Sequence, residues 1–164
     1  MIYLFLTLII IGIVVLDQIS KLIVVGNMAL GESVTLIDGI FGLRYVHNTG
    51  AAFSIFSGHT EILSIFTIIL IAAVSVYLFT RKNLKLDLFT VALAFIIGGG
   101  IGNIIDRMFR SGIFLKGYVV DMFEFLFVDF AVFNVADSFI TVGAILVAIA
   151  VLMGHDAYWQ TKKS

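Results

Sequence analysis

Charged residues are scarce in this chain of 164 residues: Asp, Glu, Lys and Arg make up 13% of it, whereas hydrophobic residues make up 61%. In a typical soluble domain about a quarter of the residues are charged and close to half are apolar. A globule of this size buries only about two thirds of its chain surface, so much of the apolar excess would face water. The composition and the mean hydropathy of +1.15 therefore predict a protein that lies in a lipid bilayer.

Cysteine and proline are both absent. Without cysteine there is no disulfide framework, no thiolate metal site, no lipidated cysteine and no cysteine nucleophile. Without proline, proline kinks are excluded as a gating device in the helices. The net charge of -1 and the lack of clustered Lys and Arg argue against nucleic acid as a partner.

Four apolar runs each approach the ~20 residues that a helix needs to cross ~30 Å of hydrocarbon. They predict an α-helical membrane protein with a single integral membrane domain over residues 1–164. A cleavable signal peptide is the alternative for the first run, but no positive segment precedes it and Asp17 lies where the cleavage region would fall. The expected spans are about 1–25, 62–80, 88–107 and 133–153, and the outer loops are 26–61 and 108–132.

Basic residues in the short connections set the expected orientation. Arg81, Lys82 and Lys85 lie between the second and third spans, and Lys162 and Lys163 follow the fourth. Because such residues favour the cytoplasmic side, we expect a multi-pass protein with both termini in the cytoplasm. The first and third spans then end, and the second and fourth begin, on the outer side.

The polar residues of three spans gather at that outer level. Asp17 lies about 24 Å along the first span at ~1.5 Å per residue, whereas the other polar residues lie at the end of the third span or the start of the fourth. The cytoplasmic halves of the spans are almost free of charge. The pattern predicts a shared polar pocket near the outer surface, built from Asp17, Asn103, Asp106, Arg107, Asn134 and Asp137.

The two outer loops contain sequence patterns typical of regular secondary structure or of the membrane interface. Ser33–Ile37 and 40–46 resemble two strands, and Asp38-Gly39 between them is suited to a type I′ hairpin turn. Residues 50–56 are typical of a short apolar helix in the membrane interface. The second outer loop is rich in Phe and Tyr, which is consistent either with a lipid-facing flap or with a plain aromatic belt.

Each charged group at membrane depth costs roughly 2.5 to 3.5 kcal/mol on insertion scales and therefore needs a partner or a purpose. Asp17 and Lys21 are four residues apart and can pair on one helix face for structural support alone. Asn103, Asp106 and Arg107 also share one face. They could form only an end cap, or Arg107 could bind a substrate oxygen and position neighbouring carboxylates.

Asp121 and Asp137 have no adjacent basic partner in the sequence. Asp137 alone could act as a charge at a helix N-terminus. If the two carboxyl groups meet, like-charge repulsion leaves them sharing one proton near neutral pH. Such a pair can hydrolyse a peptide bond, because the ionised member activates water while the protonated member donates to the carbonyl oxygen.

Other chemistries fit less well. No His-Glu-x-x-His pair is present, and the histidines are scattered, so we expect no metal ion. No Gly-x-Ser-x-Gly elbow is present either. Gly98 and Gly102 form a small-x-x-x-small face that allows close helix packing. A proton or cation transporter and a purely structural bundle remain as rival classes.

Over nearly its whole length the sequence resembles the lipoprotein signal peptidases, the type II signal peptidases of bacteria. The motifs match in order and in their placement on the spans. They are Asp17-Gln18-Ile19-Ser20-Lys21, Asn48-Thr49-Gly50-Ala51-Ala52-Phe53-Ser54, Gly102-Asn103-Ile104-Ile105-Asp106-Arg107, Val119-Val120-Asp121 and Phe133-Asn134-Val135-Ala136-Asp137-Ser138.

The resemblance implies an intramembrane aspartyl endopeptidase that removes signal peptides from prolipoproteins, cutting N-terminal to a diacylglyceryl-modified cysteine. It implies Asp121 and Asp137 as the catalytic pair, no cofactor, and a small extracytoplasmic sheet called a cradle. It also implies a place in the bacterial cytoplasmic membrane with the site at the outer leaflet, and we expect a monomer in contact with lipid. The positions matching the family's supporting and substrate-binding residues are Asp17, Lys21, Asn48, Gly50, Asn103, Asp106, Arg107, Asn134 and Ala136.

The sequence departs from the family pattern at one place. Many members carry a proline shortly before the Phe-Asn-x-Ala-Asp string, whereas Ala131 and Val132 stand there in this chain. The path of the loop before the fourth span is therefore not implied by the resemblance.

Overall fold

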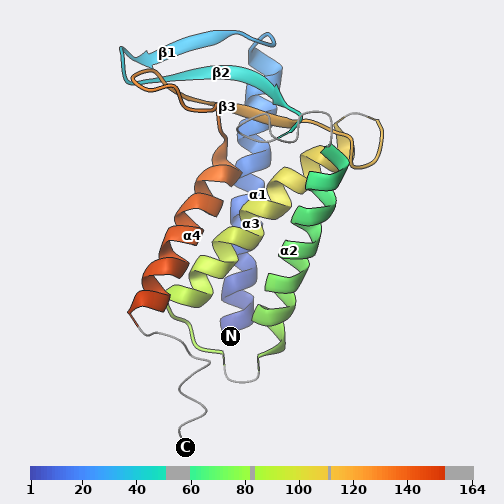
Figure 1. Ribbon diagram of the computed structural model, residues 1–164, viewed down its shortest axis with the longest axis vertical. Coiled ribbons are helices and arrows are strands. Elements are labelled where there is room, and N and C mark those ends of the chain that lie inside the picture. The colour runs from blue at the N-terminus through green and yellow to red at the C-terminus, as the bar shows by residue number, and fades with distance from the viewer. Residues whose placement is uncertain (51–59, 82–83, 111, 154–164) are drawn as a thin grey trace, which may run out of the picture.

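The computed structural model describes residues 1–50, 60–81, 84–110 and 112–153 (Figure 1). In this part of the chain it has four helices that are long and apolar enough to span a membrane, and a three-stranded antiparallel sheet. This confirms the predicted helical membrane fold with a small sheet. The elements are α1 (Ile2–Asn27), β1 (Ser33–Ile37), β2 (Phe41–Asn48), α2 (Thr60–Thr80), α3 (Leu88–Phe109), β3 (Val119–Phe125) and α4 (Val135–Leu152).

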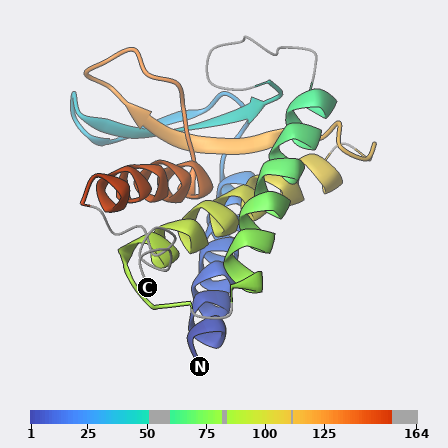
Figure 2. The same ribbon diagram turned by 60° about the horizontal axis from the view of Figure 1, so that its bottom comes forward.

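The sheet lies across one end of the helices, and the N-terminus lies at the other end (Figures 1 and 2). Because successive helices run in opposite directions, α1 and α3 end beside the sheet, whereas α2 and α4 begin there. This alternation places the last turns of α1 and α3 and the first turns of α2 and α4 at one level.

Helix α3 lies between α2 and α4 in both views and is the most buried of the four helices. It begins with a capping box in which the Asp87 side chain accepts from the Thr90 backbone N–H and the Thr90 hydroxyl accepts from the Asp87 N–H. These bonds satisfy backbone donors that a helix start leaves unpaired. The remaining helices can therefore pack around an α3 whose first turn is fixed.

Glycines let the other helices approach α3 closely. A Cβ built on Gly98 would lie 3.0 Å from the Cβ of Ile13 in α1, and one on Gly99 would lie 2.5 Å from the carbonyl oxygen of Ala136 in α4. Gly100 faces α2 in the same way. The close packing predicted at Gly98 is confirmed, and the glycine run serves three neighbouring helices because successive residues point in different directions around α3.

The predicted hairpin is present, but its turn is not type I′. β1 and β2 pair antiparallel with Ile37 opposite Phe41, and the Ile40 N–H donates to the Ile37 carbonyl. Gly39 has a φ of +69°. A type I′ turn needs positive φ at both central residues, and Asp38 does not adopt it, so that prediction is wrong.

A third strand that the sequence did not reveal lies within the second outer loop. β3 pairs antiparallel with β2, so that Asp121 lies opposite Val46. Val119 to Met122 are all buried because β3 lies on the helix side of β2. The predicted interfacial helix over 50–56 falls in 51–59, apart from Gly50, and so lies outside the described residues.

We expect the substitution Gly99→Ala to lower the unfolding temperature of the protein in detergent. The new methyl group would meet the α4 backbone at 2.5 Å, and overpacking of this kind costs about 1–3 kcal/mol. Gly12→Ala is the matched control, because a Cβ on this α1 glycine meets nothing within 4 Å. It should stabilise the helix by about 0.5–1 kcal/mol. Equal effects of the two substitutions would contradict the packing described above.

Candidate active site

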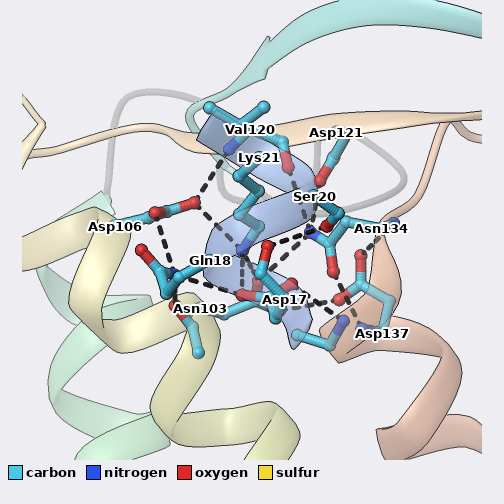
Figure 3. Close-up of polar contacts among 12 residues, drawn as sticks. Asp17, Gln18, Ser20, Lys21, Asn103, Asp106, Val120, Asp121, Asn134 and Asp137 are labelled. Atoms are coloured by element: carbon cyan, nitrogen blue, oxygen red, sulfur yellow. Dashed lines mark hydrogen bonds and ion pairs between the residues drawn. The ribbon is translucent and has the colours of Figure 1, made fainter. Parts of the chain in front are cut away.

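All but one of the polar residues expected at the outer level form one connected network at the sheet end of the helices (Figure 3), the exception being Arg107. α1, α3, the start of α4 and strand β3 all contribute side chains to it. Most of these groups are buried, so each needs a hydrogen-bond or charge partner. The shared polar pocket predicted from the sequence therefore exists.

One lysine and two aspartates form a fully buried ion cluster. Lys21 Nζ lies 2.8 Å from Asp17 Oδ2 and 3.0 Å from Asp106 Oδ2, and all three side chains are 0% exposed. The Asp17–Lys21 pair within α1 is the predicted one. Asp106 pairs both with Lys21 and, at 2.6 Å, with Arg110, the residue that caps the C-terminal end of α3.

The two aspartates also hold backbone groups of other elements. Asp17 Oδ1 accepts from the Ala136 N–H of α4 at 3.0 Å, and Asp106 Oδ2 accepts from the Val120 N–H of β3 at 3.1 Å. The predicted support position Ala136 thus acts through its backbone. The ion cluster fixes both the start of α4 and the strand that carries Asp121.

Gln18 is a member of this network whose role the sequence did not indicate. Its Nε2 donates to Asp17 Oδ2 at 3.1 Å, to the carbonyl of Gly102 at 3.0 Å and to Asp106 Oδ1 at 3.3 Å. A single amide therefore bridges two carboxylates that would otherwise repel each other. The feature of the sequence that could have indicated this role is the position of Gln18, a polar residue within a membrane span and next to the charged Asp17.

Asn103 connects the ion cluster to Asp137. Its Oδ1 accepts from Lys21 Nζ at 3.0 Å and from Asn134 Nδ2 at 3.1 Å. With both donors on its oxygen, the amide must turn its Nδ2 toward Asp137 Oδ1, and that distance is 2.7 Å. Lys21 thereby fixes the orientation of a side chain that binds the Asp137 carboxylate.

Asp137 is also part of the N-terminal cap of α4. The Asn134 side chain accepts from the Asp137 N–H at 2.9 Å, and Asp137 Oδ2 accepts from the Asn134 N–H at 3.2 Å. This reciprocal pair is a capping box. The helix-terminus interpretation of Asp137 is therefore correct, and it leaves Oδ1 of the same carboxylate bound to Asn103.

Asp121 reaches the same place from the sheet. Its Oδ2 accepts from Asn48 Nδ2 at 2.8 Å, and its Oδ1 accepts from Asn134 Nδ2 at 2.6 Å. The predicted support position Gly50 donates its N–H to Asn48 Oδ1 at 3.1 Å, which orients the Asn48 amide. Side chains alternate along a strand, so Asp121 points away from Val120 and Met122, which pack with Val24 and Tyr45.

The structure brings the two predicted carboxyl groups together around Asn134. This residue donates its side-chain amide to Asp121 and its backbone N–H to Asp137. Burial and the nearby charge of Asp137 together raise the pKa of the Asp121 carboxyl to about 7. Two carboxyl groups in such surroundings can share a single proton at neutral pH.

A cavity of about 550 Å³ opens beside this pair, between α2 and α4. Asn48, Asn103, Arg107 and Asp137 lie in its wall. Asp121 is not itself a wall residue but accepts a hydrogen bond from the wall residue Asn48. Arg107 is 7% exposed, and its Nη1 has no hydrogen-bond partner among the described residues. The arrangement places an unpaired donor, two amides and the Asp137 carboxyl group around one space, and one of those amides binds the Asp121 carboxyl group.

His47, the one histidine among the described residues, does not join the site. His47 stacks on Tyr118 with ring centroids 3.5 Å apart and shares a hydrogen bond with the Tyr45 hydroxyl at 2.8 Å. His59 and His155 lie outside the described residues. Within the ranges that the structure describes, no group of three or more His, Asp or Glu side chains is placed to hold a metal ion.

Comparisons with known proteins agree with this architecture. The family described as "Signal peptidase (SPase) II" matches residues 9–153. The chain is 44% identical to the lipoprotein signal peptidase of Streptococcus pyogenes serotype M5 (strain Manfredo) over 143 residues, which cover 87% of this chain and 90% of the relative. The lipoprotein signal peptidase of serotype M18 (strain MGAS8232) matches to the same extent.

Two solved structures have the same fold. One is a bacterial membrane enzyme determined by the in meso method at 2.3 Å, with a TM-score of 0.80 and 34% identity over 93% of this chain and 90% of that one. The other, determined by the same method at 1.9 Å, has a TM-score of 0.77 and 36% identity over 90% and 92% of the two chains.

Four apolar helices, three of which bring buried carboxylates and amides together beneath a small sheet, define a multi-pass membrane enzyme. Within that class, the chain belongs to the signal peptidase II family, whose members are proteases.

We expect Lys21→Met to destabilise the protein strongly. The substitution would leave the buried Asp17 and Asp106 carboxylates without their shared cation, and breaking a buried ion pair in this way costs about 3–5 kcal/mol. Lys116→Met is the matched control, since it removes an exposed ion pair with Glu61. Such an exposed pair adds little stability because water screens it. Unfolding temperatures in detergent provide the measurement, and a Lys21 variant as stable as the Lys116 variant would contradict the ion cluster's structural role.

Proposed function

We propose that this protein removes signal peptides from prolipoproteins by aspartyl catalysis, with Asp121 and Asp137 as the catalytic pair. The cut lies N-terminal to a diacylglyceryl-modified cysteine. Family membership and the relatives named lipoprotein signal peptidase support the substrate class. The observation that carries the catalytic assignment is the joint binding of both carboxyl groups by Asn134, beside a cavity large enough for a peptide segment.

The chemistry follows from one proton shared between two carboxyl groups. The ionised member takes a proton from a water molecule, which attacks the scissile carbonyl carbon, while the protonated member donates its proton to the carbonyl oxygen. When the tetrahedral species collapses, the leaving amine takes a proton from the first carboxyl group and the second regains its own. The pair thus returns to its initial singly protonated state.

The surrounding residues have positioning roles in this mechanism. Asn48, Asn103 and Asn134 hold the carboxyl oxygens, so the two acids keep their orientation when the proton moves. The free Nη1 of Arg107 is available to a carbonyl oxygen of the bound peptide. Donors fixed in advance in a water-poor site stabilise developing negative charge better than mobile water does.

The distribution of charge supports an orientation with the sheet outside. Asp17, Lys21, Asp106 and Asp137 lie at the sheet end of the helices, whereas Arg81 follows the opposite end of α2. Basic residues favour the cytoplasmic side, so both termini are cytoplasmic and the site lies at the outer leaflet of the bacterial cytoplasmic membrane. The protein acts as a monomer in contact with lipid. A transmembrane proton or cation path finds no such support, because these buried charges occupy one end only.

Asp121→Asn and Asp137→Asn should each abolish processing of a lipidated precursor, with at least a ~10³-fold fall in rate, because an amide cannot exchange the shared proton. The carboxamide nearly preserves shape, so both variants should still insert and fold. The mass of the precursor after incubation with purified protein is the measurement.

Asp129→Asn is the matched control, since Asp129 lies exposed in the loop that follows β3. It should process the precursor at the wild-type rate. Normal processing by either dyad variant would refute the catalytic assignment, and a wild-type protein that leaves the precursor intact would refute the proposed activity itself.

Processing should depend on pH through the shared proton. Because the pKa of Asp121 is raised to about 7, the protonated form persists up to about that pH and is lost above it. The rate should therefore be nearly constant just below pH 7 and fall about tenfold per unit well above it. Unfolding temperatures at the same pH values separate proton loss from denaturation. A rate that rises steadily between pH 7 and 9 would contradict this model of the pair.

A further inference from the structure

Six phenylalanine side chains form a connected cluster beside the cavity. Phe125 is its centre, with ring centroids 5.2 Å from Phe133, 5.5 Å from Phe127 and 6.0 Å from Phe130. Phe130 also meets Phe133 edge to face at 6.0 Å. Such contacts favour well-defined ring positions. The complete cluster is Phe41, Phe123, Phe125, Phe127, Phe130 and Phe133.

Three of these rings line the cavity, and they define what we call the aromatic arm. Its wall consists of Phe125 and the consecutive apolar residues 130–133. The polar wall residues Asn48, Asn103, Arg107 and Asp137 border the same cavity. A ligand that fills this space therefore has a polar, reacting part beside Asp137 and an apolar part that continues from it.

The cavity wall also includes residues of α4 that face the lipid. Thr141 and Val142 line the cavity and are exposed on the outside of the helices, and Val142 is 45% exposed. Phe130 is itself 50% exposed. An apolar chain that starts in the aromatic arm can therefore pass over α4 beside Val142 toward the bilayer.

We propose that the aromatic arm binds the acyl chains of the substrate's lipidated cysteine close to the glycerol, and that Phe130 is a specificity-determining residue for them. The inference rests on the proposed function, because it needs a substrate whose scissile bond lies next to a lipid. In such a substrate the thioether fixes the glyceryl group within a few bonds of the cleaved amide. The acyl chains then emerge beside Asp137, where the aromatic arm begins.

The alternative occupant is the signal peptide. That segment lies on the N-terminal side of the cut and must cross the membrane, so its residues fit the part of the cavity lined by the spans, with Leu63 and Thr67 of α2 opposite Ile140 of α4. The aromatic arm is built instead by Phe125 at the end of β3 and by the loop between β3 and α4. The signal peptide and the acyl chains of one substrate thus contact different parts of the cavity wall.

The test compares two lipidated precursors that differ only in acyl length, a dipalmitoylglyceryl and a diacetylglyceryl form, processed by wild type and by Phe130→Ala in the same detergent. The wild type should prefer the long-chain precursor. Removing the Phe130 ring should lower kcat/KM for that precursor about tenfold and for the short-chain one less than about twofold, because only contacting partners show coupled losses. The effect should fall on KM, since the ring contacts the chain before and during reaction alike.

Phe127→Ala is the matched control. Phe127 is 66% exposed and contacts Phe125 as Phe130 does, but it does not line the cavity. It should lower the stability of the phenylalanine cluster to a similar extent while leaving the preference for long chains unchanged. Equal loss of that preference in both variants, or an unchanged preference in Phe130→Ala, would overturn the proposal.

A second measurement separates this inference from the proposed activity. A dipalmitoylglyceryl precursor with a photoreactive diazirine in the acyl chain near the ester is bound to Asp137→Asn, which does not need to turn over, and the labelled residues are located by mass spectrometry. Label within 125–133 supports the acyl site even if no precursor is cleaved. Label confined to α2, or labelling that short-chain and long-chain competitors suppress equally, would overturn it.

Discussion

The buried amine of Lys21 is the interaction on which the rest of the site depends. It is 0% exposed and lies between two carboxylates from different helices. An isolated charge at this depth would be unstable, and α1 and α3 must meet in one register for Lys21 to neutralise both carboxylates. The carboxylates then hold the backbone of α4 through Ala136 and that of β3 through Val120.

From this cluster the order of the hydrogen bonds leads outward to the proposed catalytic pair. Lys21 fixes the Asn103 oxygen, the Asn103 nitrogen binds Asp137, and Asn134 joins Asp137 to Asp121. Lys21 orients the Asn103 amide, and Asn103 in turn accepts from the Asn134 amide and so orients it. The acids at the end of the path are therefore held in position without an ion pair of their own, as the proposed sharing of one proton between them requires.

The sequence predicted the parts of this architecture that carry strong local or energetic signals. The membrane spans can be predicted because such helices must be long and apolar. The Asp17–Lys21 pair can be predicted because residues four apart lie on the same face of a helix. β3 was missed because Val119, Val120 and Met122 show no alternation with polar residues in a strand that is buried on both faces. The bridging role of Gln18 depends on the relative rotation of α1 and α3, which no local pattern records.

Asp137 shows why one residue can satisfy two interpretations. A carboxylate has two oxygens, and here one caps the helix that carries it while the other accepts from Asn103. Capping sets the side chain in a narrow range of rotamers at the first turn of α4. The structural role therefore orients the proposed reactive group and is compatible with it.

The ion pairs within single helices have a consequence for biogenesis. Asp17 has its counter-ion four residues later on α1, and Asp106 has one four residues later in Arg110, the residue that caps the end of α3. Each acid can thus be neutralised by its own stretch of chain when that stretch enters the bilayer, without a partner from another helix. When α1 and α3 then pack together, Lys21 pairs with Asp106 as well as with Asp17, so neither acid has to be unpaired at any stage.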